Sequence, residues 1–140
     1  MLNKEELQRI TESIRLAESR TSGEIRVCIA RQCKGSPLDA ALKKFRQLKM
    51  DTTHLRNGVL IYISPFRHKA AIIGDQGIHE AANEDFWNEA MEVMLSHFRN
   101  GAITEGICKG VEKVGELIKS RYPVSENDIN ELSDEVIMDE

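Results

Sequence analysis

The residues with the clearest chemical potential lie where runs of apolar residues begin and end. Asp75 follows one apolar run, inside the segment GDQG at residues 74–77. Glu24 begins a second apolar run, and Asn57 directly precedes a third. Carboxylate and amide oxygens are the ligands that hard cations such as Ca²⁺ and Mg²⁺ prefer. These residue types predict a divalent-cation site, provided that the fold brings them together.

More acids and one histidine lie near Asp75 in the sequence and enlarge this candidate site. For Glu84 and Asp85 the alternative is a structural role, because carboxylates stabilise the positive end of a helix. For Asp75 the alternative is that it caps a turn. The predicted ligands are Glu24, Asn57, Asp75 and Glu80, with Asp51, His79, Glu84 and Asp85 as secondary candidates. Ca²⁺ is the first candidate ion and Mg²⁺ the second.

Periodicity predicts the elements that must position these residues. Apolar residues at helical spacing predict helices over about residues 4–20, 37–48, 84–99 and 104–121. Short apolar runs predict strands over residues 24–30, 58–64 and 69–74. Asn3 and Ser36 are predicted to cap the first two helices. The buried stripe of the second helix is predicted to comprise Leu38, Ala41, Leu42, Phe45 and Leu48.

The lengths of the connections predict how the strands are arranged. The four residues 65–68 are too few for a parallel crossover, so the strands on either side of them form an antiparallel hairpin. The first two strands are joined through a helix and can therefore run parallel. The resulting α/β fold is a three-layer α/β/α sandwich, with a mixed sheet of at least three strands and helices on both faces. Glu24, Asn57 and Asp75 then meet at one edge of the sheet.

Composition limits the class of protein and its location. The chain of 140 residues fits one domain, predicted at 1–123. Residues 124–140 carry seven acids and no Lys or Arg, and are predicted to form an acidic tail, flexible or loosely docked. The rest of the chain is only mildly basic, which excludes a nucleic-acid surface. No apolar run is long enough for a membrane span and no apolar signal region is present, so we expect a cytoplasmic protein.

The three cysteines do not form a recognisable site. Cys28, Cys33 and Cys108 are an odd number and include no C-x-x-C pair. This pattern argues against a disulfide framework and against a zinc site. We expect Cys28 and Cys108 to be small packed thiols.

Several blocks of the sequence resemble the TPM domain family. They are GEIRVCIA, RNGVLIYIS, AIIGDQGIHE and FRNGAITEGICKGVEKVGELI, and together the resemblance covers about residues 5–122. The closing NELSDE is similar to a short, stand-alone branch of the family. The chain departs from the commoner family pattern in two places. It has Arg56-Asn57-Gly58 where many members have Asp-Gly or Asp-x-Gly, and His79 where many have a glutamate.

The resemblance implies an α/β/α sandwich and leaves two functions open. Some family members are described as plant plastid acid phosphatases, others as accessory factors of membrane complexes, and several bind calcium in acidic loops. One hypothesis is therefore a divalent-cation-binding domain that carries out metal-assisted phosphoester hydrolysis. The other is a non-catalytic interaction module, in which the ion orders loops and the acidic tail or the cleft contacts a protein partner. Whether the chain is an enzyme is left undecided.

Overall fold

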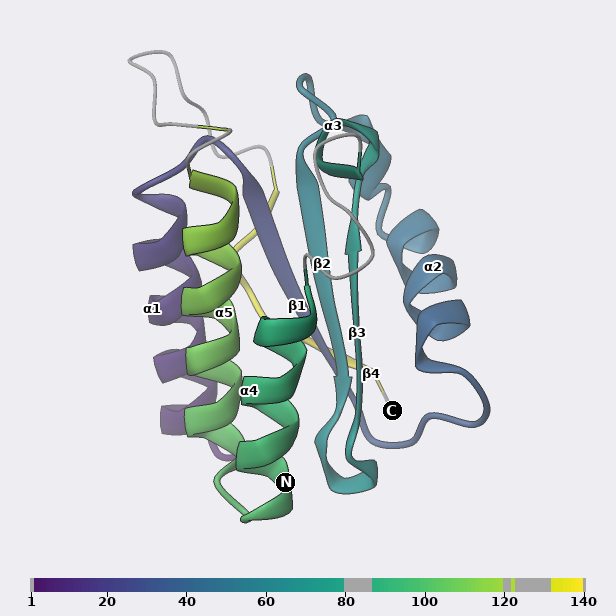
Figure 1. Cartoon of the computed structure of the whole chain (residues 1–140), viewed down its shortest axis with the longest axis vertical. Helices are drawn as coiled ribbons and strands as arrows, with labels where there is room; N and C mark the ends of the chain where they lie inside the picture. The colour runs from purple at the N-terminus through teal and green to yellow at the C-terminus, as the bar shows by residue number, and fades with distance from the viewer. Residues whose placement is uncertain (1, 80–86, 120–121, 123–131, 140) are drawn as a thin grey trace.

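A four-stranded mixed sheet lies between two layers of helices (Figure 1). The computed structural model describes residues 2–79, 87–119, 122 and 132–139. The strands are β1 (Glu24–Ala30), β2 (Gly58–Ser64), β3 (Lys69–Gly74) and β4 (Ile137–Asp139), in the order β3-β2-β1-β4. β1 runs parallel to β2 and β4, while β2 and β3 are antiparallel. The predicted strand limits and both predicted pairings are confirmed.

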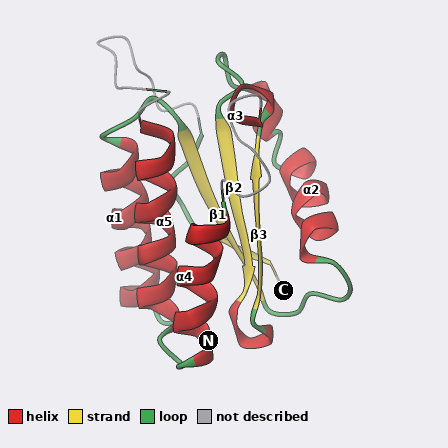
Figure 2. Cartoon of the chain, in the orientation of Figure 1, coloured by secondary structure: helices red, strands yellow, loops and turns green. Residues whose placement is uncertain are grey.

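Helices cover both faces of the sheet, which confirms the predicted three-layer α/β/α sandwich. Figure 2 shows these outer layers in red on either side of the yellow strands. α1, α4 and α5 lie on one face and α2 lies on the other (Figure 1). The bounds are α1 Lys4–Glu18, α2 Pro37–Gln47, α3 Gln76–His79, α4 Asn88–Arg99 and α5 Ile103–Lys119, with short 3-10 turns at Met50–Thr52 and Pro65–Arg67.

Capping explains where the first two helices begin. The side chain of Asn3 accepts a hydrogen bond from the Glu6 N–H, and the Glu6 carboxylate accepts one from the Asn3 N–H. This reciprocal capping box satisfies backbone donors that a helix start leaves unpaired. Ser36 caps α2 by accepting from the Asp39 N–H. Both predicted caps are confirmed.

The larger core lies under α1, α4 and α5, and a smaller one lies under α2. Ala41 and Phe45 of α2 are buried as predicted, but Leu38 and Leu42 are 51% and 37% exposed, so their predicted burial was wrong. α2 is the one described helix on its face, and only the stripe that points at the sheet is covered. The predicted packed thiols are confirmed, since Cys28 and Cys108 are both buried and free.

Two elements differ from the sequence-based expectations. α4 begins at Asn88, four residues after the predicted helix start, and residues 80–86 lie outside the described part of the chain. β4 pairs with Cys28–Ala30 at the free edge of β1, inside the segment for which only an acidic tail was expected. Leu132, Val136 and Ile137 pack against the two cores. The described part of this segment therefore lies along the sheet.

Candidate functional site

The strand register brings three predicted site residues to one end of the sheet. Glu24 lies opposite Gly58 in the parallel pair, and its N–H donates to the carbonyl of Asn57 at 3.2 Å. The Asp75 N–H donates to the carbonyl of Gly58 at 2.8 Å. The starts of β1 and β2 and the end of β3 thus meet, as the topology predicts. We call this region the acidic end; it comprises Glu18, Glu24, Asn57, Asp75 and Asp134.

Asp75 is held by an arginine. The Nε and Nη2 atoms of Arg56 donate to the two Asp75 carboxylate oxygens at 2.7 and 2.9 Å. The Gln76 N–H also donates to Asp75, at 2.8 Å. The Asp75 side chain is only 4% exposed, and its hydrogen bond raises the pKa of the Arg56 guanidinium. The guanidinium therefore occupies the place beside Asp75 that a metal cation would take.

The backbone around this ion pair is tightly fitted. Arg56 has a positive φ of 52°, which is uncommon for a residue other than glycine. Its carbonyl accepts a hydrogen bond from the Gly77 N–H at 2.9 Å. A Cβ at Gly77 would lie 2.7 Å from the Leu55 carbonyl oxygen and 2.8 Å from that of Arg56. Glycine is required here because α3 touches the loop before β2, and this contact holds Arg56 beside Asp75.

Asn57 joins the loop before β1 to the start of β2. Its Nδ2 donates to the carbonyl of Ser22 at 2.9 Å, and its N–H donates to Thr53 Oγ1 at 3.2 Å. The residue is 2% exposed. Its Oδ1 is buried and has no hydrogen-bond partner among the described residues. A buried acceptor without a hydrogen-bond partner lowers the stability of the fold unless another group interacts with it. A cation is one group that can do so.

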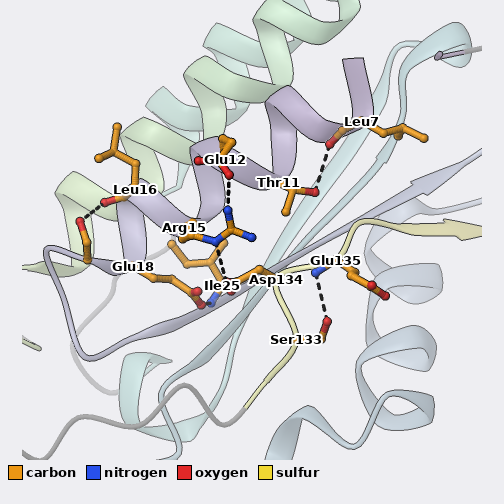
Figure 3. A network of polar contacts seen from close by, with 11 residues as sticks. Leu7, Thr11, Glu12, Arg15, Leu16, Glu18, Ile25, Ser133, Asp134 and Glu135 are labelled. Atoms are coloured by element: carbon orange, nitrogen blue, oxygen red, sulfur yellow. Dashed lines mark hydrogen bonds and ion pairs between the residues drawn. The ribbon is translucent and has the colours of Figure 1, made fainter. Parts of the chain in front are cut away.

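A second carboxylate group lies beside Glu24. Glu18, Glu24 and Asp134 line a cavity of about 280 Å³, together with Arg15, Ser19 and residues 21–23. Figure 3 shows Glu18, at the end of α1, close to Ile25 and Asp134. A Glu18 carboxylate oxygen accepts from the Ile25 N–H at 2.8 Å, and Arg15 Nε lies 3.9 Å from an Asp134 oxygen. α1, β1 and the C-terminal segment each contribute one acid.

Burial raises the pKa of Glu18 well above its ordinary value of 4.5. A hydrogen bond shared with Asp134 raises it further, and so do the negative charges of Asp134 and Glu24. The bond from the Ile25 N–H acts in the opposite direction. Glu18 therefore keeps its proton at neutral pH when no cation is bound, and in that form it hydrogen-bonds to Asp134.

None of the remaining predicted ligands has a described side chain at the acidic end. Glu80, Glu84 and Asp85 lie outside the described residues, and so does the side chain of His79, which ends α3. Asp51 is exposed in the Met50–Thr52 turn, where its charge adds to the raised pKa of Arg56. Across the residues that the structure describes, no three His, Cys, Asp or Glu side chains stand close enough together to hold a metal ion.

Glu18 and Asp134 were missed as site residues. Glu18 ends a predicted helix shortly before the predicted strand that begins with Glu24, and this nearness could have indicated that the two acids meet. Asp134 gave no such indication, because nothing in an acidic tail marks one carboxylate as docked.

The chain is thus a four-stranded α/β/α sandwich domain with acids at one end of its sheet. The family model of the TPM domain matches residues 1–117, and the chain belongs to the TPM domain family. In the described ranges, no helix combines the length and the apolar character needed to cross a membrane.

Solved structures agree with this assignment. The chain is similar to the BA42 protein of the psychrophilic bacterium Bizionia argentinensis, with 36% identity, a TM-score of 0.90, and coverage of 99% of this chain and 95% of that one. An N-terminal domain from P. gingivalis has 18% identity and a TM-score of 0.70, covering 90% of this chain and 83% of that one. The N-terminal domain of cg2496 from Corynebacterium glutamicum has 12% identity and a TM-score of 0.65, covering 83% and 73%. Among curated proteins no significant match was found.

Proposed function

We propose that this TPM domain binds a divalent cation at the acidic end and works as a binding module in which the ion orders the surrounding segments. The observation that carries the proposal is the convergence of Glu18, Glu24 and Asp134 on one cavity. The side-chain Oδ1 of Asn57 has no described hydrogen-bond partner and offers a further oxygen. Asn57 is next to Glu24, because its backbone carbonyl accepts a hydrogen bond from the Glu24 N–H. Asp75 is not assigned as a ligand, because Arg56 already pairs with both of its oxygens.

Calcium suits this set of oxygens better than magnesium. Ca²⁺ accepts six to eight oxygens in flexible geometry, whereas Mg²⁺ requires near-ideal octahedral geometry. Because no described trio of acids is preformed, binding requires Glu24 to turn toward the Glu18–Asp134 pair, with water completing the shell. A site with few charges and much water is weak, so we expect a dissociation constant of about 0.1–1 mM.

Cation binding has a direct structural consequence. Asp134 belongs to the C-terminal segment, whereas Glu18 ends α1 and Glu24 begins β1. An ion shared by these acids fastens the C-terminal segment to the sheet. It also displaces the proton that the raised pKa of Glu18 retains, so binding becomes tighter as the pH rises. The function that this arrangement serves best is binding of a protein partner that recognises the docked position of the acidic C-terminal segment.

Phosphoester hydrolysis stays a prediction from the family resemblance. Two threonine hydroxyls near the acidic end make structural hydrogen bonds: Thr21 Oγ1 donates to the Tyr122 carbonyl, and Thr53 Oγ1 accepts from the Asn57 N–H. Among the contacts given above for the acidic end, none specifically favours hydrolysis over binding.

A calcium titration followed by amide NMR tests the proposal. We expect saturable shifts at Glu18, Glu24, Asn57 and Asp134. The double variant Glu24→Gln/Asp134→Asn weakens binding about tenfold or more, because two carboxylates become neutral. Glu92→Gln, at an exposed acid of α4, is the matched control and leaves the affinity unchanged. Shifts confined to other acids, or none at about 10 mM Ca²⁺, contradict the proposal.

A further inference from the structure

A second cavity, of about 370 Å³, lies at the opposite end of the sheet. Its floor is formed by the last two residues of β1, where the parallel strands end. The remaining lining residues come from the loop after β1, the turn between β2 and β3, and β4: Arg31, Gln32, Phe66, Arg67, Met138 and Asp139. We call this region the basic end. In Figure 1 it lies at the lower end, by the β2–β3 turn and the C-terminus.

The charges that line this cavity leave it positive. Arg31 and Arg67 are exposed, and neither has an ion pair or side-chain hydrogen bond with a described residue. The one acid in the lining, Asp139, lies 3.5 Å from Lys44 Nζ and is partly neutralised by it. The cavity lining therefore carries two guanidinium groups and one carboxylate, and the charge of that carboxylate is partly balanced by Lys44. Guanidinium groups bind carboxylate and phosphate oxygens in a two-pronged geometry.

Backbone contacts hold the frame of the cavity. The Arg31 N–H donates to the Asp139 carbonyl at 3.0 Å and joins the loop after β1 to β4. Lys69 Nζ donates to the carbonyls of Cys33 at 2.9 Å and Gly35 at 3.1 Å, which fixes the same loop against β3. The cavity is thus formed before any ligand binds, and little ordering of the backbone opposes binding.

Two of the described residues that line the cavity also present apolar surface. The Phe66 ring is 54% exposed and Met138 is 37% exposed. A half-exposed aromatic ring beside arginines is suited to a flat ring that carries negative charge. Ligands of α/β sheets commonly bind beyond the carboxyl ends of parallel strands, and this volume suits a small molecule.

We propose that the basic end binds a small aromatic oxyanion. Its carboxylate or phosphate group lies between Arg31 and Arg67, and its ring packs against Phe66 and Met138. This site is separate from the cation site, and it shares no residue with it. The two proposals can therefore fail independently.

Benzoate and phenyl phosphate are the probes, titrated into the full chain and followed by amide NMR. We expect shifts at Arg31, Gln32, Phe66, Arg67 and Met138 at about 10 mM probe or below. Whichever of the two binds more tightly identifies the oxyanion. Inorganic phosphate and benzyl alcohol each carry only one of the two required features, and we expect each to bind about tenfold more weakly or less. Shifts located elsewhere, or equal binding of inorganic phosphate, overturn the proposal.

Variants separate this cavity from general charge attraction. Arg31→Gln/Arg67→Gln is expected to weaken binding of the better probe about tenfold or more, while the amide spectrum stays dispersed because both side chains are exposed. Arg46→Gln removes an exposed arginine of α2 that does not line the cavity and leaves binding unchanged. Phe66→Ala is expected to weaken the aromatic probe and not inorganic phosphate. Equal effects of the Arg46 and Arg31/Arg67 changes overturn the proposal.

Discussion

The two ends of the sheet use charge in opposite ways. At the acidic end, the carboxylates of Glu24 and Asp75 belong to residues that are 3% and 5% exposed, and Asp75 is paired with Arg56. At the basic end, Arg31 and Arg67 are exposed and make no described ion pair. The charged side chains are therefore buried where β1 and β2 begin, and they are exposed and without a described ion pair where these strands end.

The difference follows from what burial demands of a charge. A buried carboxylate must be paired, hydrogen-bonded or protonated, because desolvation is costly. The acidic end meets this demand in two ways: Arg56 pairs with Asp75, and Glu18, whose pKa is raised by burial, keeps its proton and hydrogen-bonds to Asp134. An exposed arginine is solvated by water and needs no partner in the protein, so it can bind a ligand. Changes at the acidic end should therefore alter stability, and changes at the basic end should mainly alter binding.

Deletion of residues 132–140 is expected to have the largest effect, because this segment contributes to both ends. It removes β4 and the partly buried side chains of Leu132, Val136 and Ile137, each worth about 1 kcal/mol. We expect the free energy of unfolding to fall by about 3 kcal/mol in chemical denaturation. A loss below about 0.5 kcal/mol would support a solvated tail instead.

Glycine-to-alanine changes compare the backbone at the two ends. Gly77→Ala forces a Cβ against two carbonyl oxygens, at 2.7 and 2.8 Å, and should cost about 2–3 kcal/mol. Gly35→Ala, in the loop that follows β1, meets nothing within 4 Å but has a φ of +85°, and should cost about 1 kcal/mol. Denaturation midpoints of both variants measure the difference. Equal losses would show that the contact at Gly77 is not tight.

A double-mutant cycle measures the Arg56–Asp75 pair. We expect a coupling of about 1–2 kcal/mol, since Asp75 is buried while Arg56 is 44% exposed and partly screened. The pair Lys113–Glu89 is the control, with a distance of 2.8 Å and an exposed Glu89. Its coupling should stay below about 0.5 kcal/mol. If the two couplings are equal, burial adds nothing to the Arg56–Asp75 pair.

Glu18→Gln tests the proton retained by Glu18 through the pH dependence of stability. The pKa of Glu18 is raised in the folded protein, so its stabilising contribution is complete below about pH 4.5 and declines as the pH rises toward that raised value. The glutamine cannot lose a proton. We expect it to match the wild type at pH 5 and to be more stable by about 1 kcal/mol at pH 8. Melting temperatures across this range measure the gap, with Glu5→Gln, on the same helix, as control; a constant gap would contradict a raised pKa at Glu18.

The fold was predictable because each strand carries its own pattern. The short link at residues 65–68 specified the hairpin, and its register placed Asp75 beside the start of β2. β4 was not predictable, because three residues in an acidic segment form a strand only by pairing with β1. The exposure of Leu38 and Leu42 depends on how much of α2 the sheet covers, which periodicity does not reveal.

The candidate site was only partly predictable. Topology brings Glu24, Asn57 and Asp75 to one end, but sequence spacing does not reveal that Arg56 turns back onto Asp75. That contact depends on a positive φ at Arg56 and on the close approach of Gly77. The partnership of Glu18 with Asp134 joins residues more than a hundred positions apart, so neither local pattern nor charge could indicate it.

The most direct test of the account titrates one labelled sample of the full chain with Ca²⁺ and then with the better aromatic oxyanion. We predict two separate sets of shifting amides. Calcium moves Glu18, Glu24, Asn57 and Asp134, and the oxyanion moves Arg31, Phe66 and Arg67. The claim that the two ends of the sheet bind opposite charges would be contradicted if calcium left the acidic end unmoved, or if both ligands shifted the same amides.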